Sequence, residues 1–269
     1  MLSFEPKTLQ AIAPMMGRVL IVDPAQASAR LLVELLQNVG LGQAWTAATT
    51  EQALSLAAAT EPYLIFTECL VDGVDGVDGA QLTRRLRRGN LSCRKAPVIM
   101  ITAQATPASI LAARDAGVHE FLRKPFAIKD LVRRIEVVAT RPRSWVEAVG
   151  YVGPDRRRFN SGEYRGARRR RVDSAADPLE ARIIQALKIV SAALDAIDQD
   201  RPQAFRALNV QAAELQNAGA LLRRVALVSA AHGLQQRLAE IGATGRLTRE
   251  AVEQPVQALL AYLPEDAAA

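Results

Sequence analysis

Apolar residues follow two alternating spacings from Arg18 to about residue 140. Short apolar runs fit strands buried on both faces, and the stretches between them repeat apolar residues at helical spacing. The expected strands are 18–22, 43–46, 63–67, 97–102 and 120–122, and the expected helices are 25–38, 49–59, 80–88, 107–117 and 128–139. Five strand–helix units in series predict an α/β fold, a five-stranded doubly wound parallel sheet with helices on both faces.

Residues 176–264 show helical spacing alone. A first helix is expected to start at Asp177-Pro178, with the aspartate as its cap, and a second after Asp200. The second pattern continues past an expected break at Gly219, and a last helix capped by Thr248 follows. Three or four amphipathic helices of this kind predict a small all-α bundle, or a surface that pairs with a second copy of the chain.

Formal charge divides the chain further. Residues 17–140 carry a balance of +2, residues 141–175 of +6 and residues 176–269 of −2, while the first 16 residues cancel. The segment with the positive excess also holds Gly, Pro and Ser, which predicts an Arg-rich linker, and Gly153-Pro154 argues against regular structure in it. The expected organisation is an N-terminal extension at 1–16, an α/β domain at 17–140, the linker at 141–175 and the helical region at 176–264.

Composition bears on class and location. No run of about 18 apolar residues is present, so no membrane span is expected. The N-terminus lacks a charged start followed by an apolar core and a cleavage site, which predicts that the protein is not secreted. Cys69 and Cys93 form no spacing pattern, and we expect reduced thiols in a cytoplasmic protein.

Polar side chains stand at the ends of four expected strands. Asp23 follows the first strand, Glu68 the third and Lys124 the fifth, and Thr102 ends the fourth. Because the carboxyl ends of parallel strands meet at one edge of a sheet, these side chains should converge in one crevice. Carboxylates bind magnesium, and a cation with a hydroxyl suits phosphoryl oxygens. The pattern therefore predicts the pocket of a magnesium-dependent phosphoryl acceptor.

Residues 17–140 also resemble the receiver domain of bacterial response regulators, the CheY-like fold. The resemblance covers about half of the chain and rests on IVD at 21–23, ITA at 101–103, AG at 116–117 and KPF at 124–126. It implies a flavodoxin-like strand order, and a signalling partner such as a histidine kinase, a phosphotransfer protein or a downstream effector. It also implies site roles: Lys124 pairs with the acceptor carboxylate, Thr102 is the switch hydroxyl, Phe121 is the aromatic switch residue, and the bond before Pro125 is cis. The helical region at 176–264 resembles no family that we identify.

The expected pocket departs from the family pattern and should be degenerate at the phosphoacceptor. Glu68 stands where the family has Asp, Pro24 stands where it has a second acid, and the loop at 69–79, CLVDGVDGVDG, is longer. The extra methylene of Glu68 should bring its carboxylate nearer Lys124 and Thr102. Asp23 remains as a weak metal ligand, so magnesium binding should be weak and ordinary phosphorylation is not expected. Glu68 either imitates the phosphorylated state or is a salt-bridged residue of an inert pocket, and the sequence leaves both open.

Three acids, Asp72, Asp75 and Asp78, repeat in the loop after Glu68. Their spacing of three differs from the alternate-residue spacing of a calcium loop. Solvated acids in a Gly-rich loop are the simpler expectation. The alternative is that one of these acids replaces the missing magnesium ligand.

His232 lies in the helical region, within AAHGLQQRL. A phosphorylated histidine would have to face solvent. Helical spacing places His232 on the stripe of Leu221, Val225 and Val228, so it is expected to be partly buried and structural. No other cluster in this region suggests an enzyme.

Two arginine clusters flank Phe159 and Tyr164 in the linker. Arginine pairs with phosphate and, with aromatic rings, stacks on bases, so the partner could be nucleic acid, an anionic nucleotide or a membrane surface. The simpler expectation is a solvated basic linker that docks on an acidic surface. The candidate anion-binding residues are Arg156, Arg157, Arg158, Arg165, Arg168, Arg169, Arg170 and Arg171.

These patterns together predict a response-regulator-like protein of two-component phosphorelay signal transduction. Its α/β domain should act as a pseudo-receiver, through protein–protein interaction at residues 97–122, while the helical region dimerises or docks the partner. One alternative is a genuine phosphoacceptor that uses Glu68 or a loop aspartate. Another is a binder of an anionic nucleotide or nucleic acid through the arginines. We expect no enzymatic activity, and no cofactor beyond weakly bound Mg²⁺.

Overall fold

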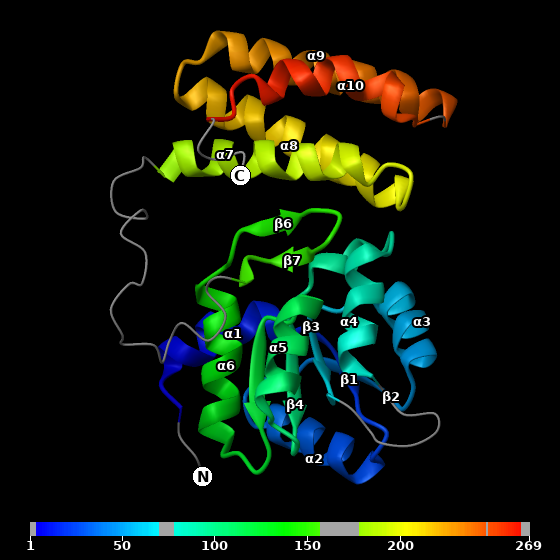
Figure 1. Cartoon of the computed structure of the whole chain (residues 1–269). Coiled ribbons are helices and arrows are strands. Elements are labelled where there is room, and N and C mark those ends of the chain that lie inside the picture. Colours follow the sequence, from blue (N-terminus) through cyan, green and yellow to red (C-terminus); the bar gives the residue numbers. More distant parts are fainter. Residues whose placement is uncertain (1–3, 70–77, 157–177, 246, 265–269) are drawn as a thin grey trace. The chain divides into compact units, whose positions relative to one another are not determined.

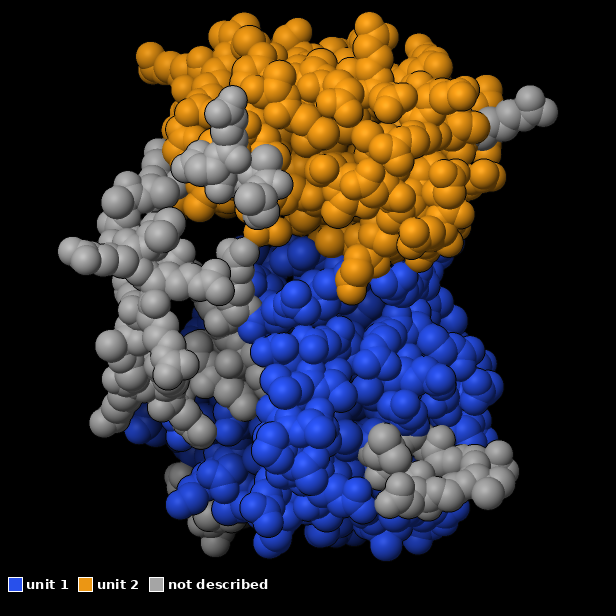
Figure 2. Space-filling model, in the orientation of Figure 1, with its two compact units in different colours: residues 1–146, 151–164 blue, residues 147–150, 165–269 orange. Residues whose placement is uncertain are grey.

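The computed structural model describes residues 4–69, 78–156, 178–245 and 247–264. The chain divides into two compact units, residues 1–146 with 151–164 and residues 147–150 with 165–269 (Figure 2).

The first unit is built on a five-stranded parallel sheet (Figure 1). Its strands are β1 (Arg18–Val22), β2 (Gln43–Ala47), β3 (Leu64–Thr67), β4 (Val98–Thr102) and β5 (Glu120–Arg123). The order β2-β1-β3-β4-β5 confirms the predicted doubly wound, flavodoxin-like topology. Val22 pairs in register with Thr67, and Thr67 pairs with Met100, so neighbouring strands end at one edge.

Helices cover both faces of this sheet, because alternate residues of each strand face opposite sides. Two buried clusters result, one with residues of α1, α2 and α6 and the other with residues of α3, α4 and α5. The bounds are α1 (Pro6–Met16), α2 (Gln26–Gln37), α3 (Thr50–Thr60), α4 (Gly79–Arg88), α5 (Pro107–Ala116) and α6 (Ile128–Thr140), with a short 3₁₀ helix η1 (Ser92–Lys95).

Local sequence explains where several helices begin and end. The Thr49 hydroxyl accepts a hydrogen bond from the Gln52 amide at the start of α3. Thr106 and Ser109 form a capping box at the start of α5. Gly117 ends α5 with φ of 92°, a left-handed conformation that favours glycine.

Two segments differ from the sequence-based expectation. Residues 1–16 are not a mere extension, since Ile12 and Met16 of α1 are fully buried with residues of α6. The linker is not free of regular structure, since β6 (Trp145–Glu147) and β7 (Val152–Pro154) form a two-stranded sheet. Helix α1 and the strands β6 and β7 lie outside the repeating strand–helix pattern, which is why that pattern did not predict them.

The described residues of the second unit form four helices, α7 (Pro178–Asp195), α8 (Arg201–Leu221), α9 (Val225–Thr244) and α10 (Arg249–Leu260). Asp200 and Thr248 cap α8 and α10 as predicted. The expected break at Gly219 is wrong, because Gly219 lies inside α8. A Cβ atom there would lie 3.0 Å from Val228 Cγ2, so this glycine allows α8 and α9 to approach closely.

Candidate functional site

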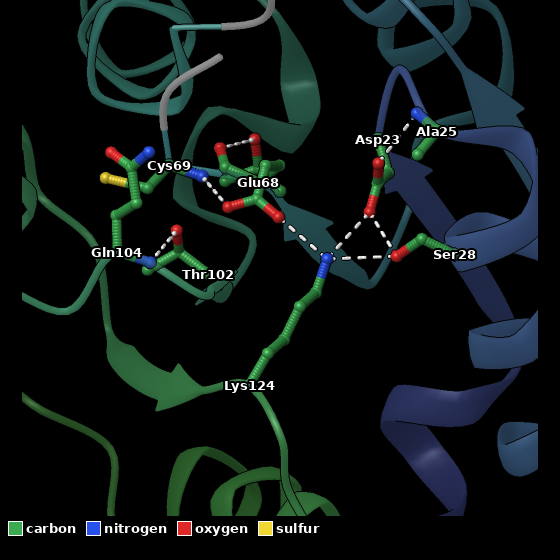
Figure 3. A network of polar contacts seen from close by, with 9 residues as sticks. Asp23, Ala25, Ser28, Glu68, Cys69, Thr102, Gln104 and Lys124 are labelled. Atoms are coloured by element: carbon green, nitrogen blue, oxygen red, sulfur yellow. Dashed lines mark hydrogen bonds and ion pairs between the residues drawn. The ribbon is translucent and has the colours of Figure 1, made fainter. Parts of the chain in front are cut away.

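Three of the predicted site residues come together at the carboxyl edge of the sheet (Figure 3). Backbone hydrogen bonds extend the parallel ladder one residue beyond each strand: Asp23 donates to Ala47, Glu68 to Val22 and Lys124 to Thr102. The side chains that follow β1, β3 and β5 are therefore held side by side.

Lys124 is the centre of the network. Its Nζ lies 2.7 Å from Glu68 Oε2, 3.1 Å from Asp23 Oδ2 and 2.9 Å from the Ser28 hydroxyl. An ammonium group has three N–H bonds, so these three acceptors use all of them. The Lys124–Pro125 bond is cis, as the family resemblance implied.

Both carboxylates also accept hydrogen bonds from donors other than Lys124. Asp23 Oδ1 accepts from the Ala25 amide at 2.9 Å, and its Oδ2 accepts from the Ser28 hydroxyl at 2.6 Å. Glu68 Oε1 accepts from the Cys69 amide at 2.9 Å. Each carboxylate side chain is 11% exposed, so the ion pairs are shielded from water.

The charge balance favours the protonated lysine. Burial alone would lower the pKa of Lys124, but hydrogen bonds and charge attraction from Glu68 and Asp23 outweigh burial and raise it. Two carboxylates face one ammonium, which leaves a net negative charge among these three groups.

The other two predicted pocket residues do not join this network. Thr102 is 1% exposed, and its hydroxyl oxygen accepts from the Gln104 amide at 3.1 Å. Within the described residues no hydrogen bond links Thr102 to Glu68, so the longer side chain reaches Lys124 but not the hydroxyl. Phe121 is buried with residues of β4 and α5.

A cavity of about 400 Å³ opens beside the network. Asp23, Glu68 and Lys124 line it together with Leu31 and Leu35 of α2. Sequence reasoning missed both this cavity and Ser28. The available signal was a hydroxyl in the first turn of the helix that follows Asp23.

Among the described residues, Asp23 and Glu68 are the pocket carboxylates that could hold a magnesium ion. No group of three or more His, Cys, Asp or Glu residues within the described chain could hold a metal. Both pocket carboxylates bind Lys124, so a metal would share them with the ammonium group. Asp78 caps α4, because its Oδ1 accepts from the Ala80 and Gln81 amides. Asp72 and Asp75 lie outside the described residues.

The expected burial of His232 is wrong. His232 is exposed, and its Nδ1 lies 3.5 Å from Gln216 Nε2. The expected stripe joined Leu221 to Val225, but these residues belong to different helices and both are exposed. A new helix starts at Val225 with its own phase, and its buried face is Leu227, Ala231, Leu234, Leu238 and Ile241.

Only one of the candidate anion-binding arginines is described. Arg156 pairs with Asp115 at 3.3 Å, and its guanidinium lies 5.2 Å from the centre of the Tyr151 ring. Arg157, Arg158, Arg165 and Arg168–Arg171 lie outside the described residues, so anion binding by this segment stays a prediction.

Comparison with known proteins agrees with this fold. Residues 19–136 match the family described as the response regulator receiver domain. The chain is 31% identical over 121 residues to a protein of Rhizobium etli named "Probable chemotaxis protein CheY", covering 45% of this chain and 91% of that one. It is 34% identical over 126 residues to the KDP operon transcriptional regulatory protein KdpE of Escherichia coli, covering 47% of this chain and 52% of that one.

Solved structures of receiver domains are similar too. The signal receiver domain of a histidine kinase from Syntrophus aciditrophicus is 27% identical, with a TM-score of 0.40, covering 48% of this chain and 96% of that one.

The chain belongs to the family of response regulator receiver domains, which act in two-component signalling. It spans about half the length of KdpE. Within the described residues no helix is long and apolar enough to cross a membrane.

Proposed function

We propose that this receiver domain signals through protein–protein interaction without ordinary aspartate phosphorylation. The observation that carries the proposal is the 2.7 Å contact between Glu68 Oε2 and Lys124 Nζ. A phosphoryl group that enters a site needs cations and N–H donors for its oxygens. Here the three N–H bonds of Lys124 are in use, and Glu68 also accepts the Cys69 amide.

Glu68 is salt-bridged to Lys124 and accepts the Cys69 amide at 11% exposure, contacts that both earlier alternatives allow. We favour the alternative in which Glu68 imitates the phosphorylated state, because its carboxylate places a fixed negative charge against Lys124, as a phosphorylated acceptor would. The receiver would then present one constant surface, formed by β4, α5 and β5, to a kinase, a phosphotransfer protein or an effector.

The rest of the chain has a supporting role in this proposal. The four-helix unit dimerises or docks the partner, and the chain acts by binding rather than as an enzyme. The proposal places the protein in the cytoplasm, where two buried, unbonded cysteines fit a reducing environment.

Intact mass spectrometry tests the proposal directly. The natural chain, Glu68→Asp and Glu68→Gln are incubated with magnesium and a small acyl phosphate. We expect no phosphoryl group on the natural chain or on Glu68→Gln, and one on Glu68→Asp, whose shorter side chain releases Lys124. Labelling of the natural chain at the site would overturn the proposal. If no variant is labelled, then Pro24 and the altered loop prevent phosphorylation of the site, and Glu68 is not the cause of its loss.

A further inference from the structure

A second cavity lies at the opposite, amino edge of the same sheet, away from Lys124. It has a volume of about 630 Å³ and is lined by residues of α1, β1, the α3–β3 connection and η1. The residues that carry the inference are Met15, Arg18, Glu61, Tyr63, Ser92 and Cys93. Nothing in the receiver mechanism uses them.

Arg18 is the unusual group of this cavity. Its guanidinium lies 4.2 Å from the centre of the Tyr63 ring, a stacking distance. Its Nε is buried and has no hydrogen-bond partner among the described residues. A buried polar atom normally has a partner, and leaving it without one destabilises the fold. Arg18 as a whole is partly exposed and lines the cavity, so its guanidinium is the cation that a ligand in the cavity would meet.

The one carboxylate of the cavity is engaged elsewhere. Glu61 accepts a hydrogen bond from the Ser92 hydroxyl and makes no ion pair with Arg18 within the described chain. Glu61 also holds a left-handed backbone conformation, φ 46° and ψ 63°, which is uncommon for a residue other than glycine. Its contact with Ser92 therefore ties the α3–β3 connection to η1, which are two walls of the cavity.

The remaining walls are apolar. Pro14 and Met15 of α1 contribute one side, Pro62 and Ala96 contribute others, and the Tyr63 side chain is 46% exposed. Such walls suit a flat apolar body, while the planar guanidinium fork suits a carboxylate that it can bind through two parallel N–H bonds.

We propose that this cavity binds a small aromatic carboxylate, with the carboxylate on Arg18 and the ring against Tyr63 and the walls from α1. The site is independent of the phosphorylation state of the receiver and goes beyond its proposed function. It also gives the N-terminal helix α1 a role in binding.

The test is a calorimetric or NMR titration of the full chain with indole-3-acetate, with indole-3-acetamide as the neutral analogue of similar shape. We expect saturable binding of the acid, and binding of the amide weaker by about tenfold or more, because a charged acceptor forms the stronger hydrogen bond with arginine. Equal binding of acid and amide, or no binding of the acid, would overturn the proposal.

Variants locate the site. Arg18→Gln should lose about tenfold or more in affinity, and Arg18→Lys should also weaken binding, since lysine keeps the charge but not the planar fork. Tyr63→Leu should weaken it less, through loss of stacking. Arg30→Gln is the matched control, since Arg30 is an exposed arginine of α2 outside the cavity, and should bind as the natural chain does. If Arg18→Gln does not fold, the Arg18→Lys variant tests the proposal. Full affinity of that variant for indole-3-acetate would contradict bidentate binding of the carboxylate by Arg18.

Discussion

Two cations of the receiver unit, the partly buried Lys124 and the fully buried Arg87, are held in opposite ways. Lys124, at the carboxyl edge of the sheet, faces two carboxylates and a hydroxyl. Arg87, at the end of α4, is fully buried and faces no carboxylate among the hydrogen bonds described. It donates to the carbonyl oxygens of Gly117, Arg94 and Ala96, and its Nη2 contacts the His119 ring.

The contrast shows in the two pKa values. Burial lowers the pKa of Arg87 to about 9, whereas the Glu68 and Asp23 carboxylates more than offset burial and raise the pKa of Lys124. Carbonyl partners do not titrate and cannot be modified, so Arg87 acts as a fixed clamp between η1 and the start of β5. Carboxylate partners carry charge, so Asp23 and Glu68 place a fixed negative charge around Lys124. One domain thus holds one cation with neutral carbonyl oxygens and the other with charged carboxylates.

The largest effect is expected for Arg87→Leu. The change leaves three carbonyl acceptors without their donor in a buried place, and each unsatisfied group costs about 1–3 kcal/mol. We expect the free energy of unfolding of the receiver unit to fall by about 3 kcal/mol or more, as measured by urea denaturation. Arg85→Leu, on the same helix, removes only an exposed ion pair with Glu51 and should cost much less, because exposed ion pairs contribute little to stability. Equal losses in the two variants would contradict the clamp.

Lys124→Met should destabilise the unit by a smaller amount, about 1–3 kcal/mol, because Asp23 and Glu68 lose their shared cation but keep other donors. Adding Glu68→Gln removes one of the two like charges. The double variant should therefore recover part of the loss, a coupling that urea denaturation of the single and double variants measures. Strict additivity would show that Glu68 and Lys124 do not interact.

His119 should produce the smallest effect, visible only as pH falls. Burial and the nearby charges of Arg87 and Arg143 lower its pKa well below 6.5, so the folded ring stays neutral. Below about pH 6.5 this histidine binds a proton in the unfolded chain but not in the folded chain. The free energy of unfolding is therefore unaffected by His119 above this pH and declines as the pH falls below it. His119→Gln should flatten this decline, and His232→Gln, at the exposed histidine, should leave it unchanged. If stability declines with falling pH to the same extent in His119→Gln, then other groups cause the decline.

The sequence predicted the features that follow from strong periodicity. Buried runs such as 18–22 and 98–102 became strands, caps such as Thr49 and Gly117 were correct, and the position after each strand placed Asp23, Glu68 and Lys124 together. Strand ends at one edge of a parallel sheet can be assigned without coordinates.

Features that depend on tertiary packing could not be predicted in this way. In the sequence TRRLRR, Arg87 cannot be told from the neighbouring arginines. Only the fold shows that it is buried and donates to carbonyl oxygens. His232 was misplaced because the turn between α8 and α9 resets the helical phase. Ser28 offered only its place in the first turn of α2, and the fold was needed to show its hydroxyl beside Lys124.

The most direct measurement of the central claim is the pKa of the Lys124 ammonium, followed by NMR in the natural chain and in Glu68→Gln. If the carboxylate of Glu68 holds Lys124 without any modification, the pKa in the natural chain lies above 10.5 and falls in the variant. An unchanged pKa in Glu68→Gln would contradict the account, because Glu68 would then place no effective charge on Lys124.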